Sequence, residues 1–194
     1  MTLPTKLTVL RIFLTFVIMT FLFIPGWVAK AIALFAFVVA SLTDWLDGYL
    51  ARRWNQMTPM GALLDPIADK VLVLGLFLAF VQLRLVPFWM VLVIIIRELL
   101  ITGVRLMAAS RHRVLAAAKE GKHKTVSQML TILVMLIALL IEEFLGPAGI
   151  APAWHMTMTV IVQGCLWVTM LLTVISGTMF FWRHRHVLRD AVNQ

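Results

Sequence analysis

Long apolar runs alternate with short breaker-containing segments along most of this chain. A helix needs about 20 mainly apolar residues to cross a bilayer. Six runs approach or exceed that length, namely residues 7–24, 27–50, 60–86, 87–107, 125–141 and 156–181. Proline and glycine fall between the runs, where helices are expected to end, at Pro25-Gly26, Pro59, Pro87, Gly121 and Gly146-Pro147. The pattern predicts an all-α polytopic membrane protein with six transmembrane helices.

Composition supports a membrane protein independently of the pattern. Of the 194 residues, 62% are hydrophobic, and the mean hydropathy is +0.97. Soluble domains contain only about 45 to 50% apolar residues. The chain shows no internal repeat, low-complexity tract or glycine-rich nucleotide loop. We therefore expect residues 1–194 to form one domain, a single helical bundle.

The positive charges predict an orientation. Two cations, Lys30 and Arg84, flank one side of the predicted bundle, and Lys70 and Arg97 lie between helix ends. Because lysine and arginine favour the cytoplasmic side, we expect both termini and residues 44–69 to face the cytoplasm. The other thirteen cations lie on that side: Lys6, Arg11, Arg52, Arg53, Arg105, Arg111, Arg113, Lys119, Lys122, Lys124, Arg183, Arg185 and Arg189.

The net charge of +8 could suit nucleic acid, but the basic residues gather at the predicted membrane edges. They do not form the compact basic module that nucleic-acid binding requires. We therefore expect no nucleic-acid partner. Anionic lipid headgroups and phosphorylated substrates are the partners that this distribution favours.

Four of the five aspartates fall within 26 residues, at Asp44, Asp47, Asp65 and Asp69. An ionised side chain at membrane depth costs about 2.5 to 3.5 kcal/mol, so several together need compensation, which bound cations would supply. At helical spacing the first two aspartates share one face, and the last two share a face of the next helix. Hard oxygen ligands suit Mg²⁺ or Mn²⁺, whereas zinc more often recruits cysteine or histidine.

Other interpretations of the same residues remain open. Gly48 and Ala51 lie one turn apart on the aspartate face, where small residues serve either close approach of a substrate or helix packing. Gly61 fits both roles equally. The acids themselves could instead pair with nearby cations, namely Arg52, Arg53 and Lys70.

Residues 44–69 carry the pattern D-x2-D-G-x2-A-R-x8-G-x3-D-x3-D, which closely resembles the motif of the CDP-alcohol phosphotransferases at every position. Further stretches resemble the bacterial branch that makes phosphatidylglycerophosphate: residues 3–8 with Arg11, residues 43–55, Arg97-Glu98, and residues 121–125 with Gln128. The resemblance implies the CDP-alcohol phosphotransferase fold, a bacterial inner-membrane location and a homodimer.

The resemblance also implies a reaction. Members of that branch transfer the phosphatidyl group from CDP-diacylglycerol to sn-glycerol 3-phosphate and release CMP. By resemblance, Asp44, Asp47, Asp65 and Asp69 hold two Mg²⁺ or Mn²⁺ ions, and Asp69 is also the general base. The residues alone do not select the base among the four acids.

For the liponucleotide, the resemblance assigns the cytidine diphosphate to Gly48, Ala51 and Arg52. Gly61 is a further candidate for the CDP-diacylglycerol site.

The second substrate requires an anion pocket near the loop that precedes the fifth run. Arg105, Lys122 and Lys124 flank this loop, and such cations bind phosphate through charge-assisted hydrogen bonds. They could instead only set the orientation of the chain. Thr125 and Gln128 could hydrogen-bond a polyol, or they could instead cap or satisfy the fifth helix. Arg97 is a further candidate, and it or the adjacent Glu98 must be functional or paired in its apolar run, although neighbours on a helix do not share a face.

Three alternative functions follow from the same pattern. A sibling enzyme could use inositol phosphate or serine as the alcohol. A divalent-cation transporter would place its acids near the membrane midplane, whereas these acids lie toward one side. A membrane prenyltransferase would present two separate acidic motifs, and this chain has one continuous pattern.

Overall fold

Six helices make up the part of the chain that the computed structural model describes, which is residues 3–54, 59–110, 120–149, 152–183 and 185. These residues contain no strand. The predictions of an all-α fold and of six helices are confirmed. In chain order the helices are α1 (Leu3–Phe23), α2 (Trp27–Trp54), α3 (Pro59–Gln82), α4 (Phe88–Ser110), α5 (Glu120–Gly149) and α6 (Pro152–Arg183).

Among the described turns, the one between α1 and α2 contains a glycine, the bend in α5 lies at a glycine, and the α3–α4 turn ends at Pro87. Gly26 between α1 and α2 has a φ of 106°, a conformation that favours glycine. The α3–α4 turn instead places Arg84 at a φ of 59°, so α3 ends at Gln82 and not at the predicted residue 86. Gly146 has a φ of 64° and kinks α5 just before Pro147.

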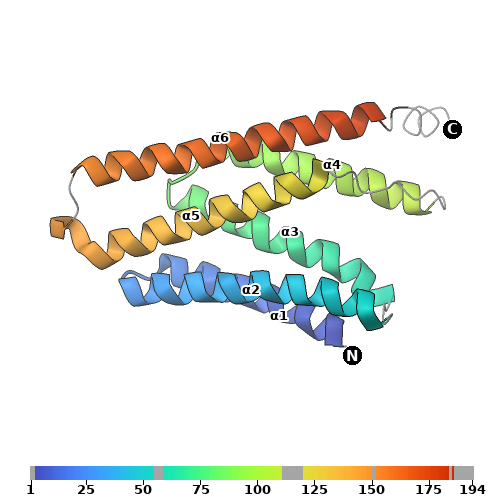
Figure 1. The fold of residues 1–194 in the computed structure, drawn as a ribbon, viewed down its shortest axis with the longest axis horizontal. Helices are drawn as coiled ribbons and strands as arrows, with labels where there is room; N and C mark the ends of the chain where they lie inside the picture. Colours follow the sequence, from blue (N-terminus) through green and yellow to red (C-terminus); the bar gives the residue numbers. More distant parts are fainter. Residues whose placement is uncertain (1–2, 55–58, 111–119, 150–151, 184, 186–194) are drawn as a thin grey trace.

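Figure 1 shows α1 and α2 along one side of the bundle and α6 along the other, with α3, α4 and α5 between them. α1 packs against α2 and α3, α2 packs against α5, and α6 packs against α4 and α5. The centre is closed by large side chains with no more than 1% of their surface exposed, among them Ile18, Leu76, Phe77, Phe80, Ile132 and Leu136. This apolar core fixes the relative positions of the helices that carry the polar residues described below.

Much of the outer surface is apolar. Phe35 is 72% exposed and Val160 is 63% exposed, and many other large hydrophobic side chains face outward. In the described part, two segments are long and apolar enough to cross a membrane, His123–Gly146 in α5 and Trp154–Arg183 in α6. Shorter apolar segments occupy α1, α2 and α3, while α4 carries three charges within its span. A surface of this kind indicates a membrane protein.

The helices share two common ends because each one reverses the direction of the one before. We call one the cation-rich end: it gathers the first residues of α1, α3 and α5 and the last residues of α2, α4 and α6, at the right of Figure 1. Lys30, near the start of α2, and Arg84, after α3, belong to the opposite end. The alternation predicted from the charges is therefore present in the fold.

Candidate functional site

The aspartate motif divides between two consecutive helices. Asp44 and Asp47 belong to the last part of α2, and Asp65 and Asp69 belong to the first part of α3. Only residues 55–58 separate the two helices, so both motif segments lie at the cation-rich end. The side chains of the four aspartates lie outside the described part of the structure, and their metal-binding role stays a prediction.

The remaining motif residues follow the same division. Gly48, Ala51 and Arg52 lie on α2, and Gly61 lies on α3. Lys122 lies at the start of α5. Their side chains also lie outside the described part, so these predicted contacts with CDP-diacylglycerol or glycerol phosphate are not tested.

The donor chemistry of the motif fits a divalent cation. Four carboxylates on two adjoining helix segments provide the hard oxygen ligands that Mg²⁺ and Mn²⁺ prefer. Among the side chains that the structure describes, no three His, Cys, Asp or Glu residues come together as an alternative site. The metal prediction therefore still falls on the four aspartates.

A buried carboxylate in the middle of α4 gathers cations from three helices. Glu98 is only 4% exposed. Its Oε2 accepts a hydrogen bond from Lys70 Nζ of α3 at 2.9 Å, and its Oε1 accepts one from Arg97 Nη1 at 3.1 Å. Lys124 Nζ of α5 donates to the same Oε1. We refer to these four residues as the Glu98 cluster.

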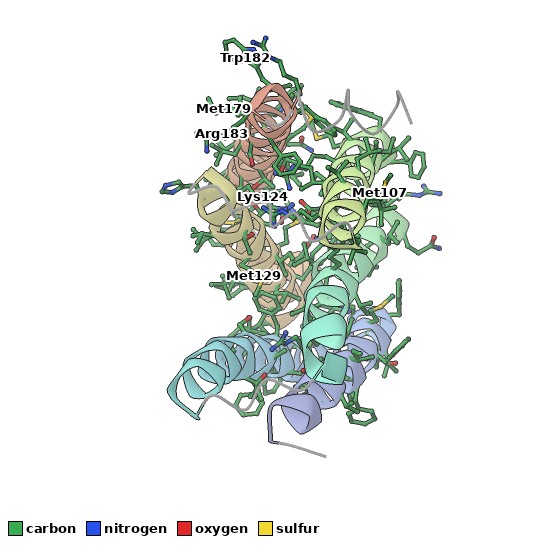
Figure 2. All side chains as sticks on the ribbon, turned by 90° about the vertical axis from the view of Figure 1, so that its right-hand side faces the viewer. Met107, Lys124, Met129, Met179, Trp182 and Arg183 are labelled. Carbon is green, nitrogen blue, oxygen red and sulfur yellow. The ribbon has the colours of Figure 1, made fainter. Side chains whose placement is uncertain are left out.

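Figure 2 shows Lys124 in the space between α4, α5 and α6. This lysine is buried, with 7% of its surface exposed. A buried ammonium group is stable only when it is paired, and Glu98 supplies the pairing. Because removing one partner of a buried pair costs about 3 to 5 kcal/mol, the Glu98 cluster holds α3, α4 and α5 in a defined arrangement.

Helix α6 covers the cluster with a short stripe of residues. Arg97 Nη2 donates to Ser176 Oγ at 2.6 Å. The next residue, Gly177, leaves room for the arginine, because a Cβ there would lie 3.1 Å from Arg97 Cγ. One turn further, the Phe180 ring lies 5.6 Å from the guanidinium carbon of Arg105, a distance at which a cation and an aromatic face attract. Both arginines of α4 therefore face the same stripe of α6.

Three buried nitrogen donors in this region have no hydrogen-bond partner within the described residues. They are Nε of Arg97, Nε of Arg105 and Nε2 of Gln128. Gln128 is 2% exposed and lies one turn beyond Lys124 on α5. Buried donors are nearly always satisfied by protein, water or ligand. Donors of this kind beside a cluster of cations are suited to a polar, anionic ligand.

The structure brings two of the predicted phosphate-binding residues to one carboxylate and places a third opposite the same helix. Arg97 and Lys124 meet at Glu98, and Arg105 faces the same helix as Arg97. Thr125, the residue after Lys124, is half-buried on α5.

Arg97 and Glu98 occupy adjacent positions on α4, which point in different directions, and their side chains nevertheless form an ion pair at 3.1 Å. The expectation that at least one of them is functional or paired in its apolar run is confirmed.

Sequence reasoning missed the central role of Glu98 and the contribution of Ser176. An acidic residue inside an apolar run was a usable signal for Glu98, since such residues are rare in membrane helices and normally have a partner. Ser176 had no comparable signal, because serine in an apolar helix usually hydrogen-bonds within its own helix.

A polar seam joins α5 to α6 beside the cluster. Thr169 Oγ1 lies 2.6 Å from Ser127 Oγ and 2.8 Å from Thr131 Oγ1. Thr131 also donates to the carbonyl of Cys165 at 3.3 Å. Such bonds join helices in an apolar environment and are each worth about 0.6 kcal/mol. The seam fixes α6 in register with the helix that carries Lys124.

Apolar outer helices, an acidic motif on two adjoining helices and a buried cation cluster together define an integral membrane enzyme of phosphorylated substrates. Comparison with known proteins narrows this class. Residues 1–176 match the CDP-alcohol phosphatidyltransferase family, and the chain belongs to that family.

Relatives cover nearly the whole chain. It is 35% identical to a CDP-diacylglycerol–glycerol-3-phosphate 3-phosphatidyltransferase of Bacillus subtilis (strain 168), over 97% of this chain and 98% of the relative. A protein of the same name from Cereibacter sphaeroides is 29% identical over 96% of this chain and 97% of the relative. The corresponding protein of Rickettsia typhi is 31% identical over 92% of this chain and 94% of the relative.

Proposed function

We propose that this protein transfers the phosphatidyl group of CDP-diacylglycerol to sn-glycerol 3-phosphate, giving phosphatidylglycerophosphate and CMP. The observation that carries the proposal is the buried Glu98 cluster, which gathers cations from α3, α4 and α5 in the same bundle as the aspartate motif on α2 and α3. The names of relatives that align over more than nine-tenths of the chain support the same reaction.

In this proposal Asp44, Asp47, Asp65 and Asp69 hold two Mg²⁺ or Mn²⁺ ions. When bound, such ions stabilise negative charge on a phosphoryl oxygen and on its leaving group. Four carboxylates without cations would repel one another in an apolar bundle, and this is a further reason to expect metal at the motif.

Asp69 accepts the proton of the primary hydroxyl of glycerol 3-phosphate. The freed oxygen attacks the phosphorus that carries the diacylglycerol, an oxygen–phosphorus bond forms, and the bond to the CMP phosphate oxygen breaks. CMP leaves with the electron pair of that bond. Gly48, Ala51 and Arg52 seat the cytidine diphosphate, with Gly61 at the edge of the same site.

The glycerol phosphate binds at the cations of the α4–α5 region. Its phosphate accepts hydrogen bonds from donors that the described protein leaves unsatisfied, of which Nε of Arg97 and Nε of Arg105 are two. In this proposal the residues that bind the glycerol phosphate are Arg97, Arg105, Lys122 and Lys124. Thr125 lies beside Lys124 and contacts the polyol.

The proposed reaction requires a site at the edge of a membrane. One substrate carries acyl chains and must stay in lipid, while the other is soluble in water, so the site belongs at a membrane edge. We propose one domain over residues 1–194, six membrane-spanning helices in a bacterial inner membrane, and both termini and the site on the cytoplasmic side. A homodimer is part of the same proposal, on the basis of family resemblance.

A substrate panel tests the reaction. Purified protein in lipid vesicles is given radiolabelled CDP-diacylglycerol, Mg²⁺ or Mn²⁺, and one alcohol at a time: sn-glycerol 3-phosphate, inositol phosphate or serine. We expect CMP release and labelled phosphatidylglycerophosphate with glycerol phosphate alone. Release with another alcohol would assign the protein to a sibling activity, and metal uptake by the vesicles without any CMP would favour a transporter.

A further inference from the structure

The carboxylate of Glu98 links the helix that carries Asp65 and Asp69 to two of the predicted phosphate-binding cations. On one side it binds Lys70, the residue that follows Asp69 on α3, at 2.9 Å. On the other side it binds Lys124 of α5 and Arg97 of α4. One carboxylate therefore connects the proposed base to the proposed phosphate site.

The contacts of Glu98 are buried, and this burial strengthens them. The side chains of Glu98, Lys124 and Arg97 are 6%, 8% and 12% exposed. Charge-assisted hydrogen bonds are strong in such surroundings and fix the geometry of both partners. Arg97 is further held by Ser176, while its Nε has no acceptor among the described residues. Glu98 thus orients the two cations and leaves a guanidinium donor available.

Among the acidic side chains that the structure describes, Glu98 has two counterparts, both at the end of α5 away from the cluster. Glu142 and Glu143 lie at the far end of α5, where Glu143 approaches Lys30 and accepts the backbone N–H of Gly26 at 3.2 Å. Glu143 is therefore a matched comparison, because it is an acid that contacts a buried lysine away from the proposed site.

We infer that Glu98 is a positioning residue for the transfer reaction: it holds Lys124 and Arg97 in the orientation that binds the phosphate of the incoming alcohol, at a fixed distance from the Asp69 segment of α3. The inference rests on the proposed function. Glu98 contacts no reacting atom in this account and acts through the two cations.

The first test compares kinetic constants of Glu98→Gln and Glu143→Gln with those of the wild type in the vesicle assay. Glu98→Gln keeps the size of the side chain and removes its charge. Since a hydrogen bond to a charged group is worth about a factor of ten or more in affinity, we expect the KM for sn-glycerol 3-phosphate to rise about tenfold. The KM for CDP-diacylglycerol should change little, and Glu143→Gln should change neither constant.

Two further variants separate positioning from a purely structural role. Glu98→Asp keeps the carboxylate but shortens its reach, so its KM for glycerol phosphate should lie between those of the wild type and Glu98→Gln. If Glu98→Gln fails to fold, Glu98→Asp carries the test alone, and a wild-type KM in it would overturn the inference. In a Lys124→Met background, Glu98→Gln should raise the KM by a smaller factor than it does in the wild type, because the part of its effect that passes through the lysine is already lost.

Calorimetric titration with sn-glycerol 3-phosphate gives a readout that does not depend on turnover. Binding to Glu98→Gln should be weaker by the same factor as the rise in KM. Unchanged binding and KM in an active, folded Glu98→Gln protein would overturn the inference and leave the proposed function intact. Failure of the wild type to make phosphatidylglycerophosphate would instead overturn the proposed function itself.

Discussion

The bundle buries a lysine at each end, and the two lysines are satisfied in different ways. Lys30 donates to the carbonyls of Leu22 and Ile24 at 2.7 and 2.9 Å, which closes the end of α1, and its Nζ lies 3.8 Å from Glu143. Lys124 instead shares one carboxylate with Lys70 and Arg97, from two other helices.

In our proposal, the difference separates a lysine that only stabilises the fold from one that also binds the phosphate of the substrate. Around Lys30 the donors and acceptors match, and the lysine joins the start of α2 to the end of α1. Around Glu98 one carboxylate serves three cations, and the neighbouring donors Arg97 Nε and Arg105 Nε have no acceptor in the described part. Unsatisfied arginine donors beside a buried cluster of cations are suited to an anionic substrate, and the following variants test this contrast.

The largest effect is expected at the aspartate motif. Asp69→Asn removes the proposed base, and general base catalysis is worth about 10² to 10⁴ in rate. We expect kcat to fall by that factor while binding of CDP-diacylglycerol remains measurable. Asp44→Asn should weaken metal and nucleotide binding as well. Equal residual binding and turnover in the two variants would contradict the division of roles.

Lys124→Met should act on the second substrate. Loss of one charge-assisted hydrogen bond to phosphate corresponds to about a tenfold to hundredfold weaker interaction, so the KM for glycerol phosphate should rise by that factor. The KM for CDP-diacylglycerol should change much less. A rise confined to CDP-diacylglycerol would show that the phosphate pocket lies elsewhere.

Lys30→Met is the matched change at the opposite end. It leaves two buried carbonyls without their donor, at a cost of about 1 to 3 kcal/mol of stability. The melting temperature in detergent should fall, while the KM values of the folded enzyme stay at wild-type values. A large rise in the KM for glycerol phosphate would remove the distinction between the two ends.

The smallest effect is expected from Gly177→Ala, which tests the packing behind Arg97. The new Cβ would lie 3.1 Å from Arg97 Cγ, so the arginine side chain must move by a few tenths of an ångström. Side-chain strain of this kind costs about 0.5 to 1.5 kcal/mol. We expect a severalfold rise in the KM for glycerol phosphate. Gly164→Ala on the same helix is the control, because nothing lies within 4 Å of its added Cβ, and an equal effect there would exclude the packing explanation.

Much of the fold could be predicted from the sequence because helix length and breaker positions are local properties. The runs anticipated all six helices within the described residues. The end of α3 was misplaced, since nothing in the apolar pattern signalled that Arg84 would adopt a left-handed conformation. Helix α5 begins at Glu120, before the apolar run predicted over residues 125–141. Polar residues are also stable in a helix that lies outside an apolar environment.

Only part of the candidate site could be predicted from the sequence. Fixed spacing identified the aspartate motif and the candidate cations, because both are patterns along the chain. Convergence of Lys70, Arg97 and Lys124 on Glu98 depends on how three helices pack, and pairing partners at such separations leave no local signal. The unsatisfied donors on Arg97, Arg105 and Gln128 likewise become visible only once burial is known.

The central claim is that the four aspartates hold divalent cations beside the cation-rich Glu98 cluster. The most direct measurement is anomalous diffraction from crystals grown with Mn²⁺ and CMP. The account predicts manganese peaks between α2 and α3, coordinated by Asp44, Asp47, Asp65 and Asp69. A motif without manganese, with its carboxylates bound instead by Arg52, Arg53 and Lys70, would contradict it.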